Sequence, residues 1–386
     1  MKVLLLSQFF STTRGGGEYV FSIISRKLAE NGHDVFVITN KISGEDYREQ
    51  KNIHVRFVQP TLEYRGGLPP GFSDNIRYSI NAIRAGLNLI RKEKIDIIHS
   101  NNFAPALAGS VLSTLTSRPH ITTVHDIFSL CGKNYWKEWG SQSDISRMNV
   151  FLAPFFEKLM IRLRYDCIHT VSEATRDDLL KFGAKKPIHV IHNAVETPEI
   201  PNTNPNPLQF VYVGRLVFYK NLEVVIRAIE MASKTEPGIR LVVIGSGPHR
   251  KTLEKLVQQT GLGSNIEFRG YVTPEDKARA ISGSSALVFP SLCEGFGLVI
   301  LEAFERERPV LVSKVRPMSD IVTDGTTGYV LDPHDEKAWA DALLGMARDQ
   351  DRATSMGKNG HGLLSEKYSQ DSMYQKIIKM YQAVLK

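Results

Sequence analysis

Two glutamates lie in or just after a glycine-rich turn that joins an expected strand at residues 286–289 to an expected helix. Glu294 lies in the turn, and Glu302 lies just over one helical turn after the helix begins near Leu298. The first N–H groups of a helix have no carbonyl partner and carry the positive end of its dipole, so this turn is suited to a diphosphate. Both carboxylates could accept hydrogen bonds from hydroxyls of one elongated ligand. A plain strand–helix connection is the alternative, and the residues alone leave both open.

Two cations follow a second expected strand, at residues 210–213. Gly214 ends this strand and is followed by Arg215, which could bind a phosphate through two parallel hydrogen bonds. Lys220 would add a compact positive charge before the next helix. The alternative is that both are solvated surface cations, as most lysines and arginines are.

The N-terminal half contributes a glycine-rich loop and a histidine. The loop at residues 14–18 contains Gly16 and Gly17 and resembles a phosphate cradle, but it lacks the Gly-Lys-Ser/Thr ending of a P-loop. His125 follows an expected strand and could exchange a hydrogen bond with a substrate hydroxyl, although a single histidine at a strand end is commonly structural. The sequence at 245–248 lacks the third glycine of a dinucleotide fingerprint, so it argues only weakly for NAD.

Other reactive patterns do not stand out. The 11 histidines are scattered and do not group with carboxylates, so we expect no metal site. Asp349 and Asp351 form an Asp-x-Asp pattern without a preceding apolar strand, which we interpret as a solvated turn. The nucleophile elbow Gly-x-Ser-x-Gly does not occur in the chain.

The candidates fall in separate halves of a chain of 386 residues, a length that predicts two domains. Short apolar runs alternate with helical patterns on both sides of residues 197–208, which contain four prolines and suit a linker. We therefore predict the α/β class, with two Rossmann-like, doubly wound parallel-sheet domains at 1–196 and 209–367 that face each other across a cleft. Residues 368–386 are expected to form an amphipathic helix that needs a partner surface for its apolar face.

Composition limits the partners and the compartment. The chain has 48 Lys and Arg against 41 Asp and Glu, and this net charge of +7 suits a phosphate-bearing substrate, an anionic membrane surface or an ordinary basic protein. No nucleic-acid partner is expected. Three scattered cysteines, and the lack of an apolar run of about 18 residues, predict a cytoplasmic protein without a transmembrane helix. Residues 148–164 are apolar with basic residues toward their end, so they form a membrane-interface segment, a lipid-acceptor groove or, as we favour, a core helix with charged edges.

Taken in order, these motifs resemble the retaining glycosyltransferases of family 4, and the resemblance covers nearly the whole chain. Each motif alone is weak, whereas the ordered set is specific. The set comprises Gly16-Gly17-Glu18, His125-Asp126, Thr-Val-Ser-Glu at 170–173, His-Asn-Ala-Val at 192–195, Gly214-Arg215-Leu216 with Lys220, Gly-Ser-Gly-Pro at 245–248, Gly270-Tyr271-Val272, and the Glu-x7-Glu signature from Glu294 to Glu302.

The resemblance implies the two-domain GT-B fold, in which the C-terminal domain binds a nucleotide-sugar donor. It also implies that the helix at 368–386 crosses back to the N-terminal domain. By this resemblance, Arg215 and Lys220 would neutralise the diphosphate, Glu302 would hold the ribose hydroxyls, and Glu294 and His125 would contact the sugar. The implied catalytic residues are His125, Glu294, Arg215 and Lys220. The implied donor-binding residues are Gly16, Gly17, Gly214, Arg215, Lys220, Gly245, Gly270, Tyr271, Val272, Glu294, Gly295, Phe296, Gly297, Leu298, Val299 and Glu302.

The expected reaction is transfer of a hexose-type sugar from a UDP- or GDP-sugar to a hydroxyl acceptor, with retention of configuration and without a metal or other cofactor. The acceptor would be a glycan or a lipid-linked molecule in cell-surface polysaccharide, glycolipid or glycoprotein synthesis, and the protein would contact the inner face of the cell membrane peripherally. Asn221 and Ala194 stand where the family often has glycine, but neither removes a ligand group. The alternatives are a nucleotide-sugar epimerase on the same fold and a non-catalytic nucleotide-sugar-binding protein.

Overall fold

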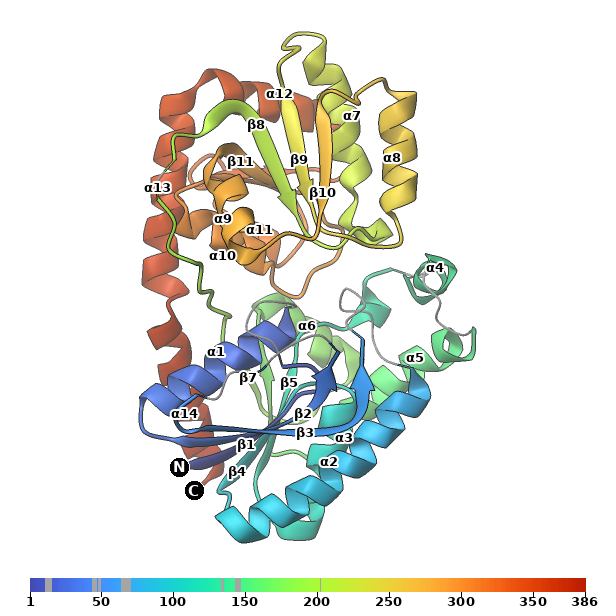
Figure 1. Cartoon of the computed structure of the whole chain (residues 1–386), viewed down its shortest axis with the longest axis vertical. Helices are drawn as coiled ribbons and strands as arrows, with labels where there is room; N and C mark the ends of the chain where they lie inside the picture. Colours follow the sequence, from blue (N-terminus) through green and yellow to red (C-terminus); the bar gives the residue numbers. More distant parts are fainter. Residues whose placement is uncertain are drawn as a thin grey trace. The chain divides into compact units, whose positions relative to one another are not determined.

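The computed structural model describes residues 1–10, 16–43, 47, 50–63, 71–132, 135–142, 147–201 and 203–386. The chain divides into two compact units, each with its own parallel sheet between helices (Figure 1). Apart from residues 141–143, unit 1 comprises the chain up to Ala194 together with Gln370–Lys386, and unit 2 comprises Val195–Ser369.

The sheet of unit 1 has seven parallel strands in the order β3-β2-β1-β4-β5-β6-β7. Its strands are β1 (Lys2–Leu6), β2 (Asp34–Ile42), β3 (Ile53–Leu62), β4 (Ile97–Ser100), β5 (His120–Val124), β6 (Cys167–Thr170) and β7 (Ile188–Val190). Its helices are α1 (Gly17–Glu30), α2 (Phe72–Glu93), α3 (Ala104–Thr116), α4 (Tyr135–Gln142), α5 (Arg147–Met160), α6 (Glu173–Phe182) and α14 (Gln370–Val384), with a short 3-10 turn η1 (Phe128–Leu130).

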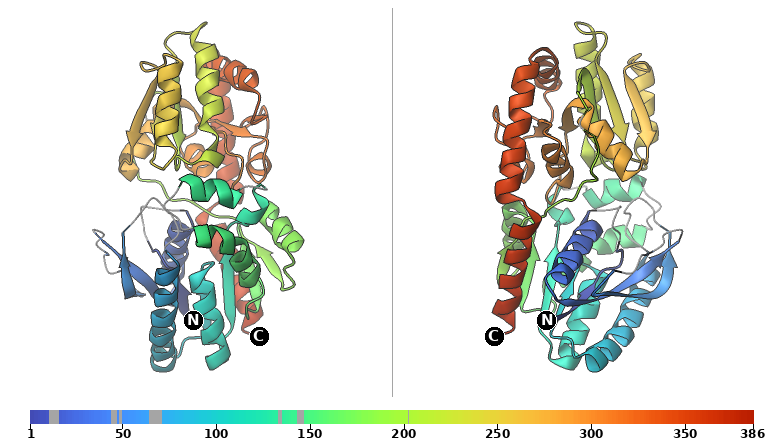
Figure 2. Two further views of the ribbon diagram at one scale, coloured as in Figure 1. Left: turned by 90° about the vertical axis from the view of Figure 1, so that its right-hand side faces the viewer. Right: turned by 60° about the vertical axis from the view of Figure 1, so that its left-hand side comes forward.

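The core of unit 1 explains why its strands are continuous apolar runs. Val3, Leu4, Leu5 and Leu6 of β1 are all fully buried, because helices cover both faces of the sheet. Leu4 and Leu6 pack toward α2 and α3, in one cluster with side chains of those helices. On the other face α1 lies beside α14, which runs along the sheet of unit 1 (Figure 2).

The sheet of unit 2 has six parallel strands in the order β10-β9-β8-β11-β12-β13. Its strands are β8 (Asn206–Val213), β9 (Arg240–Ile244), β10 (Ile266–Gly270), β11 (Ser284–Phe289), β12 (Val310–Ser313) and β13 (Gly328–Leu331). Its helices are α7 (Leu222–Ser233), α8 (Arg250–Gln259), α9 (Pro274–Ser282), α10 (Leu298–Glu305), α11 (Met318–Ile321), α12 (Glu336–Arg348) and α13 (Gln350–Lys367), with a 3-10 turn η2 (Phe218–Lys220).

Each sheet reverses its strand order at one point, between β1 and β4 in unit 1 and between β8 and β11 in unit 2. In such doubly wound sheets the crevice beyond the carboxyl ends of these two strands is where ligands bind. The predicted fold class, two parallel-sheet α/β domains, is therefore confirmed. The loops after β8 and β11 carry Arg215, Lys220 and Glu294, and Glu302 lies on α10, which follows the second loop.

Two local predictions from the sequence differ from the structure. Residues 206–208, predicted as the end of the linker, already belong to β8, and Pro207 is tolerated because it lies at the beginning of that strand. The Asp-x-Asp pattern is the beginning of α13 rather than a solvated turn, since the Asp349 carboxylate accepts a hydrogen bond from the Arg352 amide at 3.0 Å. The expected C-terminal helix at 368–386 is observed as α14.

Candidate functional site

The turn between β11 and α10 has the predicted shape. Gly297 adopts a left-handed conformation with φ of 98° and precedes α10, which begins at Leu298. The Ile300 amide donates to the Gly297 carbonyl at 2.9 Å, so the amides of Leu298 and Val299 precede the first bond of the helix. The side chains of Phe296 and Val299 are buried, and the Phe296 ring packs on Tyr368, so a donor would meet these residues through their backbone.

The cation Lys220 and the carboxylate of Glu294 form an ion pair, and both side chains are almost buried. The Lys220 ammonium also lies 4.9 Å from the centre of the Phe289 ring. The sequence predicted the two residues as separate ligand contacts, one for phosphate and one for sugar. The structure instead brings them together from the loops after β8 and β11, so that their charges neutralise each other.

Arg215 is held beside this pair by two tyrosines. Its guanidinium donates to the Tyr219 hydroxyl at 2.8 Å, and its carbonyl accepts from the Tyr212 hydroxyl at 2.9 Å. Tyr219 also accepts the Leu292 amide on its carbonyl at 2.7 Å, which joins the two loops. The two loops meet because β8 and β11 are neighbours in the sheet. Tyr212 and Tyr219 were missed from the sequence, because an isolated tyrosine carries no recognisable spacing.

Asn221 explains why this position tolerates a departure from glycine. Its φ is 52°, a left-handed conformation that asparagine adopts more readily than most residues. Its side-chain amide donates to the carbonyls of Pro333 at 2.8 Å and Pro290 at 3.3 Å. The side chain therefore adds links from the loop after β8 to the segments after β11 and β13 that a glycine could not make.

Glu302 is buried in α10 and is only half satisfied. Its Oε1 accepts from the ammonium of Lys277, on α9, at 2.7 Å. Its Oε2 is buried and has no hydrogen-bond partner in the part of the chain that the structure describes. A buried carboxylate oxygen without a partner is costly, so this atom is prepared to accept a bond from a ligand hydroxyl. Lys277 was not predicted, because nothing in the local sequence distinguishes it from the other lysines of the chain.

Three of the predicted glycines form one backbone ladder at the ends of β8, β9 and β10. The Gly214 amide donates to Ile244 at 3.0 Å, and the Gly245 amide donates to the Gly270 carbonyl at 2.7 Å. A Cβ at Gly245 would lie 1.9 Å from the Gly214 carbonyl oxygen. The close packing of these backbones therefore explains why position 245 is a glycine, and no ligand is needed for that explanation. Tyr271, which follows the ladder, is exposed, and Val272 is half-buried.

In unit 1 the predicted histidine and glycine loop are in contact. A Cβ on Gly17, the first residue of α1, would lie 2.6 Å from His125 Nε2. That nitrogen is buried and has no hydrogen-bond partner among the described residues. Burial, together with the nearby His169, lowers the pKa of His125 to about 3, so the ring is neutral at neutral pH. Arg14 and Gly15, predicted in the same loop, lie outside the described residues.

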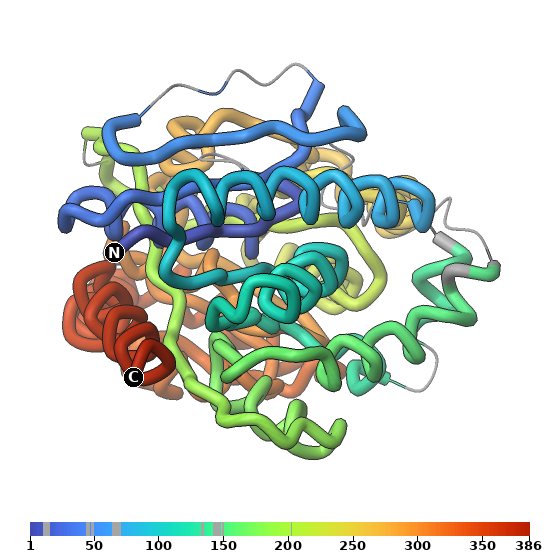
Figure 3. The backbone as a smooth tube through the Cα atoms, turned by 90° about the horizontal axis from the view of Figure 1, so that it is seen from below, coloured from blue at the N-terminus to red at the C-terminus, as the bar shows by residue number. Residues whose placement is uncertain are grey.

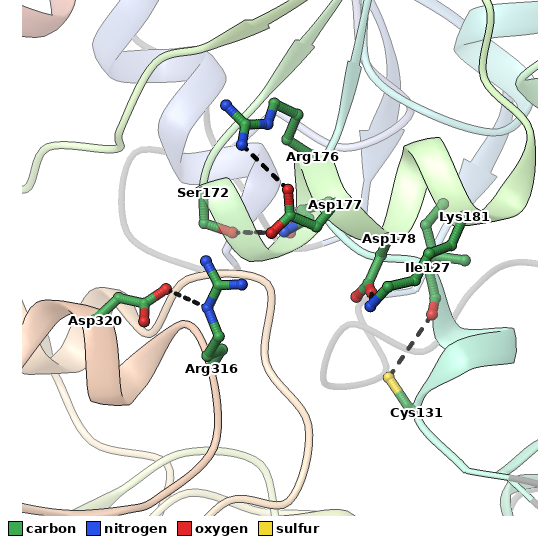
Figure 4. Close-up of polar contacts among 10 residues, drawn as sticks. Ile127, Cys131, Ser172, Arg176, Asp177, Asp178, Lys181, Arg316 and Asp320 are labelled. Carbon is green, nitrogen blue, oxygen red and sulfur yellow. Dashed lines mark hydrogen bonds and ion pairs between the residues drawn. The ribbon is translucent and has the colours of Figure 1, made fainter.

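Other arginines near strand ends are paired within their own units. Arg176, at the beginning of α6, reaches Asp177 at 3.1 Å, and Arg316, before α11, reaches Asp320 at 2.7 Å (Figure 4). Because each of these arginines is paired with an aspartate, neither is as well suited as Arg215 to bind a phosphate. Within the described residues, no group of three or more His, Cys, Asp or Glu side chains has the arrangement of a metal site.

Comparisons with known proteins show the family of the chain. Residues 14–199 match the model of Glycosyltransferase Family 4, and residues 195–380 match that of Glycosyl transferases group 1. An uncharacterised glycosyltransferase of Methanocaldococcus jannaschii is 27% identical over 383 residues, which is 99% of this chain and 98% of that protein.

Solved structures share the architecture along the whole chain. Sucrose-phosphate synthase from Thermosynechococcus elongatus superimposes with a TM-score of 0.81 at 22% identity, covering 99% of this chain and 98% of that one. HepE from Anabaena, solved in complex with UDP-glucose, gives a TM-score of 0.74 at 18% identity, covering 99% and 100%. The chain belongs to the group 1 glycosyltransferases of family 4, and it is a GT-B enzyme that transfers a sugar from a nucleotide sugar.

Proposed function

We propose that the protein moves a hexose-type sugar from a UDP- or GDP-sugar to a hydroxyl of a glycan or lipid-linked acceptor, with retention of configuration and without a metal. Its biological role would be the synthesis of cell-surface polysaccharide, glycolipid or glycoprotein glycans. The observation that carries the proposal is the cluster after β8 and β11, where Arg215 and the Lys220–Glu294 pair lie near the beginning of α10.

The nucleoside would be recognised by Glu302. Its unpartnered Oε2 would accept a hydrogen bond from a ribose hydroxyl, which removes the penalty of a buried, unsatisfied oxygen. Lys277 holds the other oxygen and so sets the direction in which Oε2 points. A deoxyribose or a nucleotide without the relevant hydroxyl would leave the penalty in place and bind more weakly.

The diphosphate would be stabilised by fixed positive groups. Arg215 presents a guanidinium fork, and the first amides of α10 present N–H groups and the positive end of the helix dipole. Lys220 would turn from Glu294 toward the phosphates, and this exchange would release the Glu294 carboxylate to accept hydrogen bonds from sugar hydroxyls. These groups supply the stabilisation that the departing diphosphate needs.

His125 would act as a neutral hydrogen-bonding group at the donor sugar. A pKa of about 3 keeps its ring uncharged, so it would position a hydroxyl rather than supply a charge. Retention would follow from attack of the acceptor on the face that the diphosphate leaves, with the departing phosphate taking the acceptor proton. No carboxylate is assigned here as a covalent nucleophile.

UDP-glucose is the donor to test first, because HepE from Anabaena binds it and shares the fold. Calorimetric titrations with UDP-, GDP- and ADP-sugars in EDTA would test the proposal, with Glu302→Ala beside the unchanged protein. Glu305→Ala is the matched control, since Glu305 is an exposed glutamate on the same helix. We expect one donor to bind in EDTA and Glu302→Ala to weaken it more than tenfold, about 1.4 kcal/mol or more.

Stereochemistry requires a separate measurement. Early proton NMR spectra of the product should show the same anomeric configuration as the donor. A product of opposite configuration would refute retention, and loss of donor binding in EDTA that returns with Mg²⁺ would refute metal independence.

A further inference from the structure

We propose that α2 and α5 of unit 1 form a face that docks on the surface of an anionic bilayer. The face, called here the α2–α5 face, consists of Phe72, Ile76, Ile80, Met148, Phe151, Phe155 and Leu159. This inference goes beyond the proposed reaction, because it concerns one surface of unit 1 and does not depend on which sugar is transferred.

The α5 part of the face is a row of large apolar side chains in water. Phe151 is 82% exposed, Met148 is 69% exposed and Phe155 is 64% exposed. Together with Leu159 they recur every three or four residues, so they lie along one side of the helix. Single exposed apolar residues are common, but a continuous row marks a surface that is covered by something. The favoured sequence interpretation of this segment as a core helix is therefore wrong for this side of α5.

The α2 part continues the same surface. Phe72, Ile76 and Ile80 are each separated by four residues and are exposed, whereas Tyr78 and Ala82 on the opposite side are buried in the core. Figure 3 shows α2 running along the outside of unit 1.

The two helices meet at their aromatic side chains. The ring of Phe72, at the beginning of α2, lies 5.7 Å from the ring of Phe156 on α5. The exposed rows of the two helices are therefore parts of one surface rather than two unrelated patches.

Among the described side chains of α2 and α5, every exposed charged group is basic. Arg77, Arg84 and Arg91 repeat every seven residues on α2, which places them in a line beside the apolar row, and all three are exposed. Lys158 on α5 and Arg162 just after it are exposed as well. These side chains have long apolar stems, so they can cover the edge of an apolar surface while their charges reach anionic headgroups.

The three carboxylates of these helices are less exposed than the cations. Glu157, the carboxylate of α5, is buried and accepts hydrogen bonds from the amides of Phe128 at 2.9 Å and Ser129 at 3.0 Å. On α2, Asp74 and Glu93 are partly buried, and Glu93 approaches Lys2 at 3.9 Å.

The sign of the charge selects the occupant. A second copy of the chain would bring the same arginines against each other, and the repulsion would oppose a symmetric dimer. An apolar protein partner would leave the row of arginines without a counterpart. A bilayer with anionic headgroups suits both the apolar row and the cations, since its interface accepts aromatic side chains and its headgroups attract positive charge.

Cosedimentation of the full-length protein with vesicles tests the proposal. One vesicle is phosphatidylcholine alone, and the other is an equal mixture of phosphatidylcholine and phosphatidylglycerol. The variants are Phe151→Asp/Phe155→Asp and Arg77→Glu/Arg84→Glu, with Leu180→Asp as control, because Leu180 is an exposed leucine on α6 of the same unit. We expect binding to the anionic vesicles only, reduced about tenfold or more by each double variant, unchanged in the control and weakened by salt.

Two results would overturn the proposal. The first is no binding to either vesicle, or equal binding to both. The second is a dimer in light scattering that the phenylalanine variant dissociates, which would make the face a contact between copies. Circular dichroism checks that the variants fold, and calorimetry with the sugar donor, in the absence of vesicles, should give unchanged affinity. Failure of membrane binding and failure of the proposed reaction are thus measured separately.

Discussion

Lys277 on α9 lies 2.7 Å from Oε1 of Glu302 on α10, while Oε2 of the same carboxylate is buried without a partner among the described residues. One oxygen is thus held by a cation and the other is left for a ligand. A lysine outside every recognised motif therefore takes part in positioning a residue of the Glu-x7-Glu signature.

Replacing Lys277 should weaken donor binding without abolishing it. In Lys277→Ala the Glu302 carboxylate loses the group that orients it, so we expect the dissociation constant for the donor to rise about fivefold to tenfold, roughly 1–1.4 kcal/mol. Calorimetry measures this directly. Lys251→Ala, which removes an exposed lysine on α8, should leave the affinity unchanged. An unaltered dissociation constant in Lys277→Ala would contradict a positioning role.

Two adjacent glycines allow a matched test of whether the contact between the glycine loop and His125 matters for catalysis. A Cβ at Gly17 would lie 2.6 Å from His125 Nε2, whereas a Cβ at Gly16 would meet nothing within 4 Å. Gly17→Ala should displace the histidine ring and lower kcat about tenfold or more. Gly16→Ala should leave the histidine ring in place, retain thermal stability and lower kcat less than Gly17→Ala does. Equal effects of the two substitutions would show that the contact with His125 is unimportant.

The Lys220–Glu294 pair predicts a characteristic double-mutant cycle. Lys220→Met leaves the nearly buried Glu294 carboxylate unpaired, and Glu294→Gln leaves the ammonium unpaired, so each single variant should lose about 2–4 kcal/mol of unfolding free energy. The double variant should regain much of this stability while transferase activity stays absent. Urea denaturation gives the free energies, and additive losses in the double variant would argue against a coupled pair.

The buried histidines of unit 1 predict loss of stability in mild acid. Burial lowers the pKa of His120 and of His169 to about 4, and it holds that of His99 well below its ordinary value. Between pH 6.5 and about 4 the unfolded chain binds protons on these rings and the folded chain does not. Stability therefore falls as pH falls through this window, by about 1.4 kcal/mol per pH unit for each histidine.

The hydrogen bonds among these histidines identify which side chains should cause the loss of stability in acid. His169 Nε2 donates to the Ile191 carbonyl at 3.2 Å, so its Nδ1 must accept from Thr123 at 2.9 Å. His99 then donates to Thr123 at 2.7 Å and accepts from the Tyr381 hydroxyl of α14 at 2.7 Å. His169→Asn should flatten the dependence of the melting temperature on pH, whereas His54→Asn, an exposed histidine of the same unit, should not. Parallel curves for all three proteins would refute this origin.

Much of the architecture was predictable from local patterns. The apolar runs at 210–213 and 286–289 were predicted as strands, and they lie in β8 and β11. The beginning of α10 at Leu298 was also predicted, since a glycine followed by an apolar helical pattern is a local signal. The ordered motifs predicted the family, which the comparisons confirm.

The sequence by itself determined the alternation of strands and helices, and with it the loops at strand ends that carry chemistry, because those signals span only a few neighbouring residues. Only the tertiary structure decided which side chains meet. Lys220 and Glu294 are 74 residues apart, and Lys277 and Glu302 are 25 apart. Strand order brings such pairs together, and nothing in the local sequence encodes it. Exposure was likewise a tertiary property: the same apolar spacing on α5 fits a core helix or a surface, and only packing distinguishes them.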